Sequence, residues 1–121
     1  MIRTNFLQLY YELGDKFYEN FCEPGPQYSP ELVSWFKEME IPNLVTDLIA
    51  NEITVDPGSG VIQPLHSALM RNLGVVFTEL CDLELLAEDC AADRRHSFMY
   101  VAAPIKIHRA TGAPVNPIAI K

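Results

Sequence analysis

Cysteine and histidine are both scarce in this sequence, with three residues of each type among 121. The cysteines are Cys22, Cys81 and Cys90, and they are widely spaced, with no Cys-x-x-Cys. An odd, scattered set of this kind does not make a disulfide framework, and free thiols are typical of a reducing compartment. We therefore expect a cytoplasmic protein in which the three thiols serve as small core residues.

The chain also lacks long apolar segments and an excess of positive charge. No apolar run approaches the roughly 20 residues that span a bilayer. The first residues, Met-Ile-Arg-Thr-Asn, lack the apolar region of a signal peptide. The 9 basic residues are outnumbered by 16 acidic ones, which gives a net charge of −7. This balance argues against nucleic acids and anionic membranes as partners, because both attract basic surfaces.

Several motifs with known chemistry are missing as well. There is no Gly-x-Gly-x-x-Gly and no Walker loop, so nucleotide binding has no support. A Gly-x-Ser-x-Gly elbow and a His-Glu-x-x-His zinc motif are also absent. His96 follows two arginines and His108 stands beside a turn, so neither is a strong candidate site residue. His66 is the histidine that remains.

What is present is enough apolar material for a core, since 49% of the residues are apolar. The length suits a single domain over residues 1–121. Periodicity and turn signals predict an α/β fold in which helices flank a mixed sheet. Asn5 and Gln8 are predicted to cap the first helix. The expected helices cover residues 6–21, 30–39, 65–73 and 83–90, and the expected strands cover residues 43–47, 75–80, 98–107 and 115–120.

Residues 65–80 form the stretch around which a site can be built. His66, Leu69, Met70 and Leu73 follow helical spacing, so the histidine shares a face with three apolar residues. Gly74 is expected to end the helix in a left-handed conformation. In the strand that follows, Glu79 falls on the same face as Val75 and Phe77. An imidazole and a carboxylate on the buried side indicate either a metal site or a core histidine with an ion-pair partner.

Two aspartates lie upstream of this stretch and are candidate substrate-binding or loop residues. Asp47 is expected at the carboxyl end of a strand, where open α/β sheets bind their ligands. Asp56 begins an Asp-Pro-Gly turn, so a capping or turn role explains it without any chemistry. The loop that contains Asp56, residues 48–64, is either the wall of a pocket or a surface excursion.

Several stretches resemble the cyclase family, which includes bacterial kynurenine formamidase and isatin hydrolase. Ser29-Pro-Glu-Leu-Val-Ser-Trp-Phe36 is similar to a Ser-x-Glu-x-Val-x-Trp-Leu helix of that family. The segment from His66 through Gly74 to Glu79 is similar to its His-x-x-Leu-Leu, Gly-Val and Glu-x-Leu elements. Weaker matches are found at residues 2–4, at Thr46-Asp47 and Asp56, and in the tail at residues 102–107, 111–115 and 118–120. The resemblance runs along nearly the whole chain but covers only the C-terminal part of the family.

The resemblance implies a partial cyclase fold of the swivelling β/β/α type and a metal-dependent hydrolase of N-formyl or cyclic amides, arylformamidase-like in its chemistry. It also implies that His66 and Glu79 are ligands of a zinc or manganese ion. The other ligands of the family come from an upstream His-x-Gly-Thr-His-x-Asp-x-Pro motif, which this sequence does not contain. The catalytic residues are therefore unknown, and this chain alone is expected to be inactive.

The missing motif leaves three readings open. In the first, another chain completes a truncated hydrolase that acts on a small amide; a complementary N-terminal chain or a homo-oligomer then covers an exposed apolar patch of more than a few hundred Å². That reading expects the side chains of His66 and Glu79 within about 3–5 Å of each other, since both bind one ion. In the second, the protein is a non-catalytic family remnant with an interaction or structural role. In the third, it is an unrelated binding module in which residues 44–47 and 75–79 are not neighbours.

Overall fold

The computed structural model describes residues 1–121, with the side chain of Asn20 left out. The chain divides into two compact units, Met1–Leu83 and Glu84–Lys121, and each is described by itself. Our expectation that residues 1–121 form one domain stays a prediction. Among the described residues, no helix is long and apolar enough to cross a membrane.

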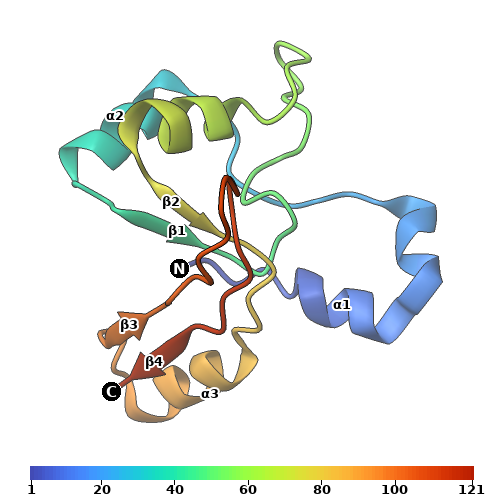
Figure 1. Cartoon of the computed structure of the whole chain (residues 1–121). Coiled ribbons are helices and arrows are strands. Elements are labelled where there is room, and N and C mark those ends of the chain that lie inside the picture. Colours follow the sequence, from blue (N-terminus) through green and yellow to red (C-terminus); the bar gives the residue numbers. More distant parts are fainter. The chain divides into compact units, whose positions relative to one another are not determined.

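A parallel pair of short strands is the centre of the first unit. Strands β1 (Asn43–Val45) and β2 (Val76–Thr78) pair with Leu44 opposite Phe77, and Ile2 adds a parallel bridge to Thr46. This pairing contradicts the unrelated-module reading, which required these two segments to lie apart. Figure 1 shows helix α2 (Pro30–Glu38) and the helix before β2 on one side of the pair. The predicted single mixed sheet is wrong, because the parallel and antiparallel strands form two separate two-stranded sheets.

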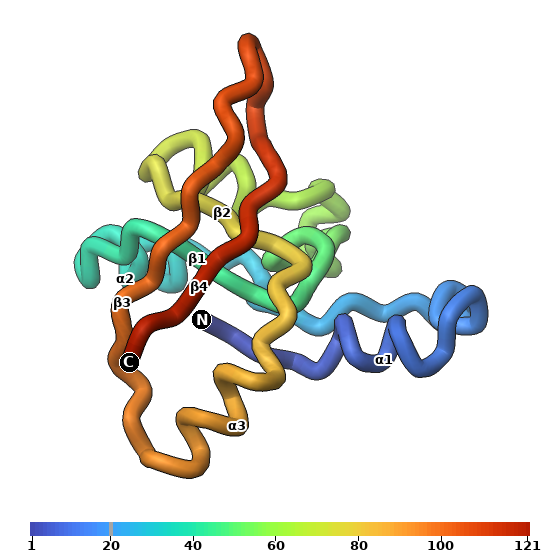
Figure 2. The backbone as a smooth tube through the Cα atoms, turned by 60° about the horizontal axis from the view of Figure 1, so that its bottom comes forward, coloured from blue at the N-terminus to red at the C-terminus, as the bar shows by residue number. Residues whose placement is uncertain are grey.

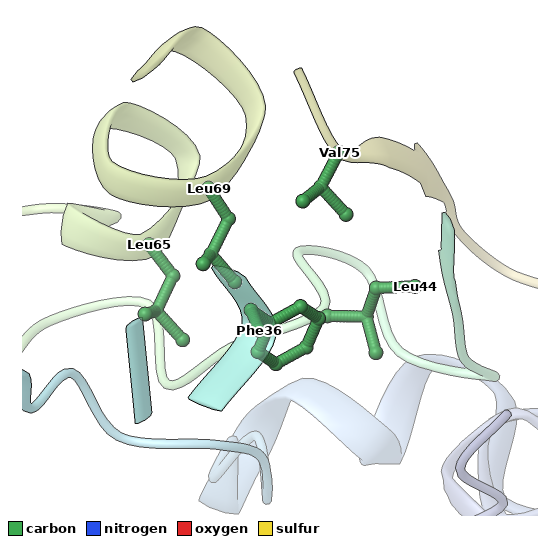
Figure 3. Packing of buried hydrophobic residues seen from close by; sticks show 5 residues of the cluster. All are labelled: Phe36, Leu44, Leu65, Leu69 and Val75. Atoms are coloured by element: carbon green, nitrogen blue, oxygen red, sulfur yellow. The ribbon is translucent and has the colours of Figure 1, made fainter. Parts of the chain in front are cut away.

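The main core of this unit lies between the strands and these two helices. Helix α2 begins as predicted, with Pro30 at its first position and the Leu32 N–H donating to Ser29 Oγ at 3.1 Å. The helix contributes Phe36, which packs in a cluster of five buried residues (Figure 3): Phe36, Leu44, Leu65, Leu69 and Val75. Each such side chain stabilises the fold by about 1.5–3 kcal/mol relative to an exposed position. This core fixes the helix that carries His66 against the strand that leads to Glu79.

The predicted helix over residues 6–21 is divided in the structure. Helix α1 (Phe6–Leu13) ends at Gly14, and a 3₁₀ helix, η1 (Gly14–Asn20), follows it. Gly14 has a φ of +55°, which a glycine adopts without the strain that another residue would feel. The predicted Asn5 cap is wrong, since the side chain of Asn5 caps nothing. Asp47 takes this role instead, because its Oδ2 accepts a hydrogen bond from the Phe6 N–H at 3.0 Å.

The second unit contains a helix and an antiparallel hairpin. Helix α3 (Glu84–Asp93) is followed by β3 (Met99–Val101) and β4 (Ile118–Ile120), with Tyr100 opposite Ala119. The predicted return of the last strand beside the one before it is confirmed (Figure 2). The ladder is short because Pro104 and Pro114 punctuate the connecting residues and proline donates no hydrogen bond to a sheet. Lys121 Nζ forms ion pairs with Asp89 and Asp93 at 2.8 and 2.7 Å.

Candidate metal centre

The helix that carries His66 is wider than an α-helix. Its central segment, η2 (His66–Arg71), is π-helical, and the Asn72 N–H after it reaches back five residues to the Ser67 carbonyl. This widening changes which residues are buried, so the predicted apolar face is partly wrong. Leu69 is fully buried, whereas Met70 and Leu73 are 43% and 37% exposed. Single π turns within helices are frequent at functional sites.

Glu52 fixes the orientation of His66. Its side chain is fully buried beneath the start of this helix, where Oε2 accepts the Leu65 N–H at 2.7 Å and Oε1 accepts the His66 N–H at 2.9 Å. Oε1 also lies 2.6 Å from His66 Nδ1. Because an ionised carboxylate only accepts hydrogen bonds, Nδ1 is the donor of this contact. The lone pair of a neutral imidazole is then on Nε2, at the opposite edge of the ring.

His66 Nε2 faces the carboxylate of Glu79. The distance from Nε2 to Glu79 Oε1 is 3.5 Å, within the predicted 3–5 Å, and β2 places Phe77 so that its ring meets the imidazole edge-on at 4.8 Å. Burial raises the pKa of Glu79, and the charges of Glu23 and Glu52 raise it further, while His66 lowers it. Both site side chains keep some exposure, 23% for His66 and 34% for Glu79. A cation beside this pair would relieve the cost of the partly buried charge.

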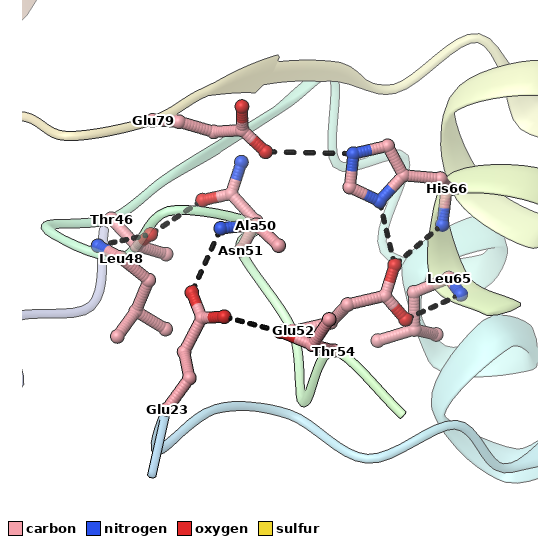
Figure 4. A network of polar contacts seen from close by, with 10 residues as sticks. All are labelled: Glu23, Thr46, Leu48, Ala50, Asn51, Glu52, Thr54, Leu65, His66 and Glu79. Atoms are coloured by element: carbon pink, nitrogen blue, oxygen red, sulfur yellow. Dashed lines mark hydrogen bonds and ion pairs between the residues drawn. The ribbon is translucent and has the colours of Figure 1, made fainter. Parts of the chain in front are cut away.

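Residues from two loops complete the polar network in Figure 4. Glu23 is buried, and its two oxygens accept the Ala50 N–H at 2.8 Å and the Thr54 hydroxyl at 2.6 Å. Thr46 donates to Asn51 Oδ1 at 2.6 Å. The segment after Glu23 approaches the loop closely at Gly25, where a Cβ would lie 2.9 Å from the Glu52 carbonyl carbon. These contacts hold the loop that carries Glu52 at a fixed place beside His66.

Asp47 and Asp56 are saturated by contacts of their own. The Asp47 carboxylate accepts hydrogen bonds from the Thr4 N–H and hydroxyl, both at 2.9 Å, besides that from Phe6. Asp56 accepts the Ser59 N–H at 2.7 Å and the Ser59 hydroxyl at 2.6 Å, and these bonds lower its pKa. These contacts give both residues structural roles, in a cap and a turn. A role in substrate binding stays a prediction for both.

Glu52, Glu23 and Asn51 were not predicted from the sequence. The loop that contains Asn51 and Glu52 shows no periodicity, so the sequence predicts only a pocket wall or a surface excursion over residues 48–64. One signal was available, because these two polar residues interrupt the apolar run Leu-Ile-Ala-Asn-Glu-Ile over residues 48–53. A polar pair within such a run is expensive to bury unless it is hydrogen-bonded or functional.

The donor set fits half of a metal site. Imidazole nitrogen and carboxylate oxygen bind zinc at about 2.0–2.2 Å, and the 3.5 Å between His66 Nε2 and Glu79 Oε1 suits two ligands of one ion. In the part of the chain that the structure describes, no cluster of three or more His, Cys, Asp or Glu side chains has the geometry to hold a metal.

The comparisons with known proteins give one informative likeness. No protein-family model matches the chain, and no curated protein matches it. Four solved chains match. One is a crystal structure described as a novel cyclase, which is 36% identical, aligns with a TM-score of 0.81, and covers 99% of this chain. This chain spans 39% of the length of that cyclase. The likeness supports the resemblance to the cyclase family over the whole of the chain.

Proposed function

We propose that the chain is the metal-site portion of a cyclase-family hydrolase that cleaves the C–N bond of N-formyl or cyclic amides. The observation that carries the proposal is the arrangement of Glu52, His66 and Glu79. A buried carboxylate holds Nδ1, and the free Nε2 faces a second carboxylate at 3.5 Å. Carboxylate–histidine–metal chains of this form are usual around catalytic zinc.

The residues of this chain have distinct tasks in the proposed site. His66 Nε2 and Glu79 would hold a divalent zinc or manganese ion, while Glu52 keeps the imidazole in the tautomer that offers Nε2. When bound, such an ion polarises a carbonyl oxygen and lowers the pKa of a bound water towards neutrality. In the overall reaction, water adds to the amide carbonyl and the C–N bond breaks, which yields a carboxylate and an amine. The general acid that delivers a proton to the leaving nitrogen is not assigned to any residue of this chain.

We further propose that a partner polypeptide or a second copy supplies the other ligands. The chain covers 39% of the solved cyclase, and two ligands do not make a well-formed catalytic site, which usually takes three or more from the protein. Apolar side chains that suit a covering surface are exposed in the first unit: Val61 at 51%, Ile62 at 68% and Val76 at 57%.

A hydrolysis assay tests the proposed function. N-formylkynurenine and small cyclic amides are incubated with the chain and Zn²⁺ or Mn²⁺, alone and with any polypeptide encoded beside it. We expect metal-dependent release of amine only when the partner is present, and loss of at least 100-fold in His66→Ala. His108→Ala, which removes the histidine beside a turn, is the matched control and keeps full activity. Hydrolysis that is unchanged in both His66→Ala and Glu79→Gln contradicts the proposal, and activity of the isolated chain contradicts the need for further ligands.

A further inference from the structure

The side-chain amide of Asn51 has an unused donor in the interior of the first unit. Asn51 is fully buried, and its Nδ2 makes no hydrogen bond in the structure. A buried donor without an acceptor costs about 1–3 kcal/mol. Almost all buried polar groups in folded proteins are hydrogen-bonded, so this group needs a specific explanation.

The Thr46 hydroxyl pairs with the oxygen end of the Asn51 amide. The Thr46 oxygen accepts a hydrogen bond from the Leu48 N–H at 3.0 Å. The same hydroxyl donates to Asn51 Oδ1 at 2.6 Å. This contact holds the amide oxygen towards Thr46 and turns the NH₂ group away from it. Asn51 also has a φ of +55°, a left-handed conformation that asparagine tolerates better than most residues.

The NH₂ group points towards the candidate metal ligands. Figure 4 shows the Asn51 nitrogen directed to the side where the Glu79 carboxylate and the His66 ring meet. The Asn51 N–H donor, the imidazole nitrogen of His66 and the Glu79 carboxylate are therefore directed to one place. Three acidic side chains, those of Glu23, Glu52 and Glu79, lie around this place. An uncharged acceptor is therefore favoured there over an anion.

We propose that Asn51 Nδ2, which has no partner within the protein, binds substrate. It donates a hydrogen bond to the carbonyl oxygen of an uncharged amide held beside His66 and Glu79. This inference rests on the proposed function for the class of substrate. It assigns to this chain a contact with the reacting carbonyl group in addition to the two metal ligands. Thr46 acts on the substrate only through Asn51 and is a positioning residue.

A titration with N-formylaniline tests the donor, with aniline as the probe that lacks the carbonyl group. The full chain with Zn²⁺ is labelled with ¹⁵N, and the Asn51 side-chain NH₂ resonances are followed. We expect N-formylaniline, and not aniline, to shift them. Asn51→Asp retains an oxygen for Thr46 but removes the donor, and we expect it to weaken binding of N-formylaniline at least tenfold. Asn116→Asp makes the same chemical change at an exposed position and leaves binding unchanged.

Further variants keep the inference separate from stability and from the proposed function. Thr46→Val removes the hydroxyl that holds the Asn51 amide, so we expect it to weaken binding of N-formylaniline. Thr46→Ser keeps the hydroxyl and should retain binding. Backbone spectra show whether each variant folds. Shifts of Asn51 that persist in His66→Ala support the donor even if zinc binding or hydrolysis fails. The inference is overturned if N-formylaniline leaves the Asn51 resonances unmoved. It is also overturned if Glu79→Gln shifts the Asn51 resonances but N-formylaniline does not, because Glu79 is then the acceptor that the Asn51 donor uses.

Discussion

Asp47, which caps helix α1, and Glu79, which faces His66, are two acidic side chains of the first unit with different roles. Asp47 follows β1, is buried, and has its oxygens saturated by donors of Thr4 and Phe6. Glu79 follows β2, is partly exposed, and lies 3.5 Å from an imidazole nitrogen. The two positions are similar in the sheet but differ in their donors. A carboxylate filled by backbone donors stabilises the fold, whereas one that meets only a histidine is available for a ligand.

The largest expected effect comes from removing the saturated carboxylate. Asp47→Ala removes the acceptor of the two Thr4 donors and the shorter of the two hydrogen bonds of the Phe6 N–H, so we expect a loss of about 2–4 kcal/mol in the free energy of unfolding. Denaturant titration measures this loss. The folded fraction should bind Zn²⁺ with unchanged affinity. A loss below 1 kcal/mol, or a Zn²⁺ affinity reduced more than threefold, would contradict the assignment of a structural role to Asp47 and a metal-binding role to Glu79.

Glu52 combines both roles, because its carboxylate accepts backbone hydrogen bonds and also contacts the imidazole of His66. Glu52→Gln should weaken Zn²⁺ binding by about 10–100-fold, the usual effect of losing a carboxylate that orients a ligand histidine, which equals about 1.4–2.8 kcal/mol. Isothermal titration calorimetry gives the affinity.

Glu23→Gln is the matched control for that change. Its carboxylate is also buried but contacts Ala50 and Thr54 rather than the imidazole. We expect it to reduce stability while it changes Zn²⁺ affinity less than threefold. Equal effects of the two substitutions on Zn²⁺ affinity would show that Glu52 acts through the fold and not through His66.

The smallest expected effect is a dependence of stability on pH. Burial raises the pKa of Glu79 in the folded chain, so between the unfolded and folded pKa values the folded state binds more protons than the unfolded state. Without metal, the stability contributed by Glu79 therefore falls as pH rises through this window, which begins at the ordinary glutamate pKa of 4.5. Glu79→Gln does not titrate there. The melting temperature of the variant minus that of the wild type should therefore rise with pH, and Zn²⁺ should reduce this rise. A difference that falls with pH contradicts the prediction.

Local rules predicted much of this fold. Ser29-Pro30 began a helix, Gly74 ended one with a φ of +75°, and Asp56 made its turn with Ser59. The errors arose where distant residues override local ones. Asp47 replaced Asn5 as the cap from 41 residues away, and no local pattern encodes such a contact.

In the candidate site too, features set by local residues were predicted and those set by distant contacts were not. Alternation along β2 placed Glu79 correctly beside His66, because a strand has a fixed period of two residues. The π turn changed the burial of Met70 and Leu73, since it is stabilised by tertiary packing and the sequence period assumed an α-helix. Glu52 lies in an irregular loop, so its position under the helix depends on the whole unit and could not be read from its neighbours.

Nitrogen-resolved NMR of the histidine rings during a Zn²⁺ titration shows whether His66 and Glu79 bind one metal ion. His66→Ala identifies the His66 signals among the three histidines. We expect Zn²⁺ to shift His66 Nε2 while Nδ1 stays protonated and bonded to Glu52, and we expect Glu79→Gln to abolish the shift. If Zn²⁺ instead binds His66 through Nδ1, or shifts only His96 and His108, then His66 and Glu79 are not two ligands of one ion.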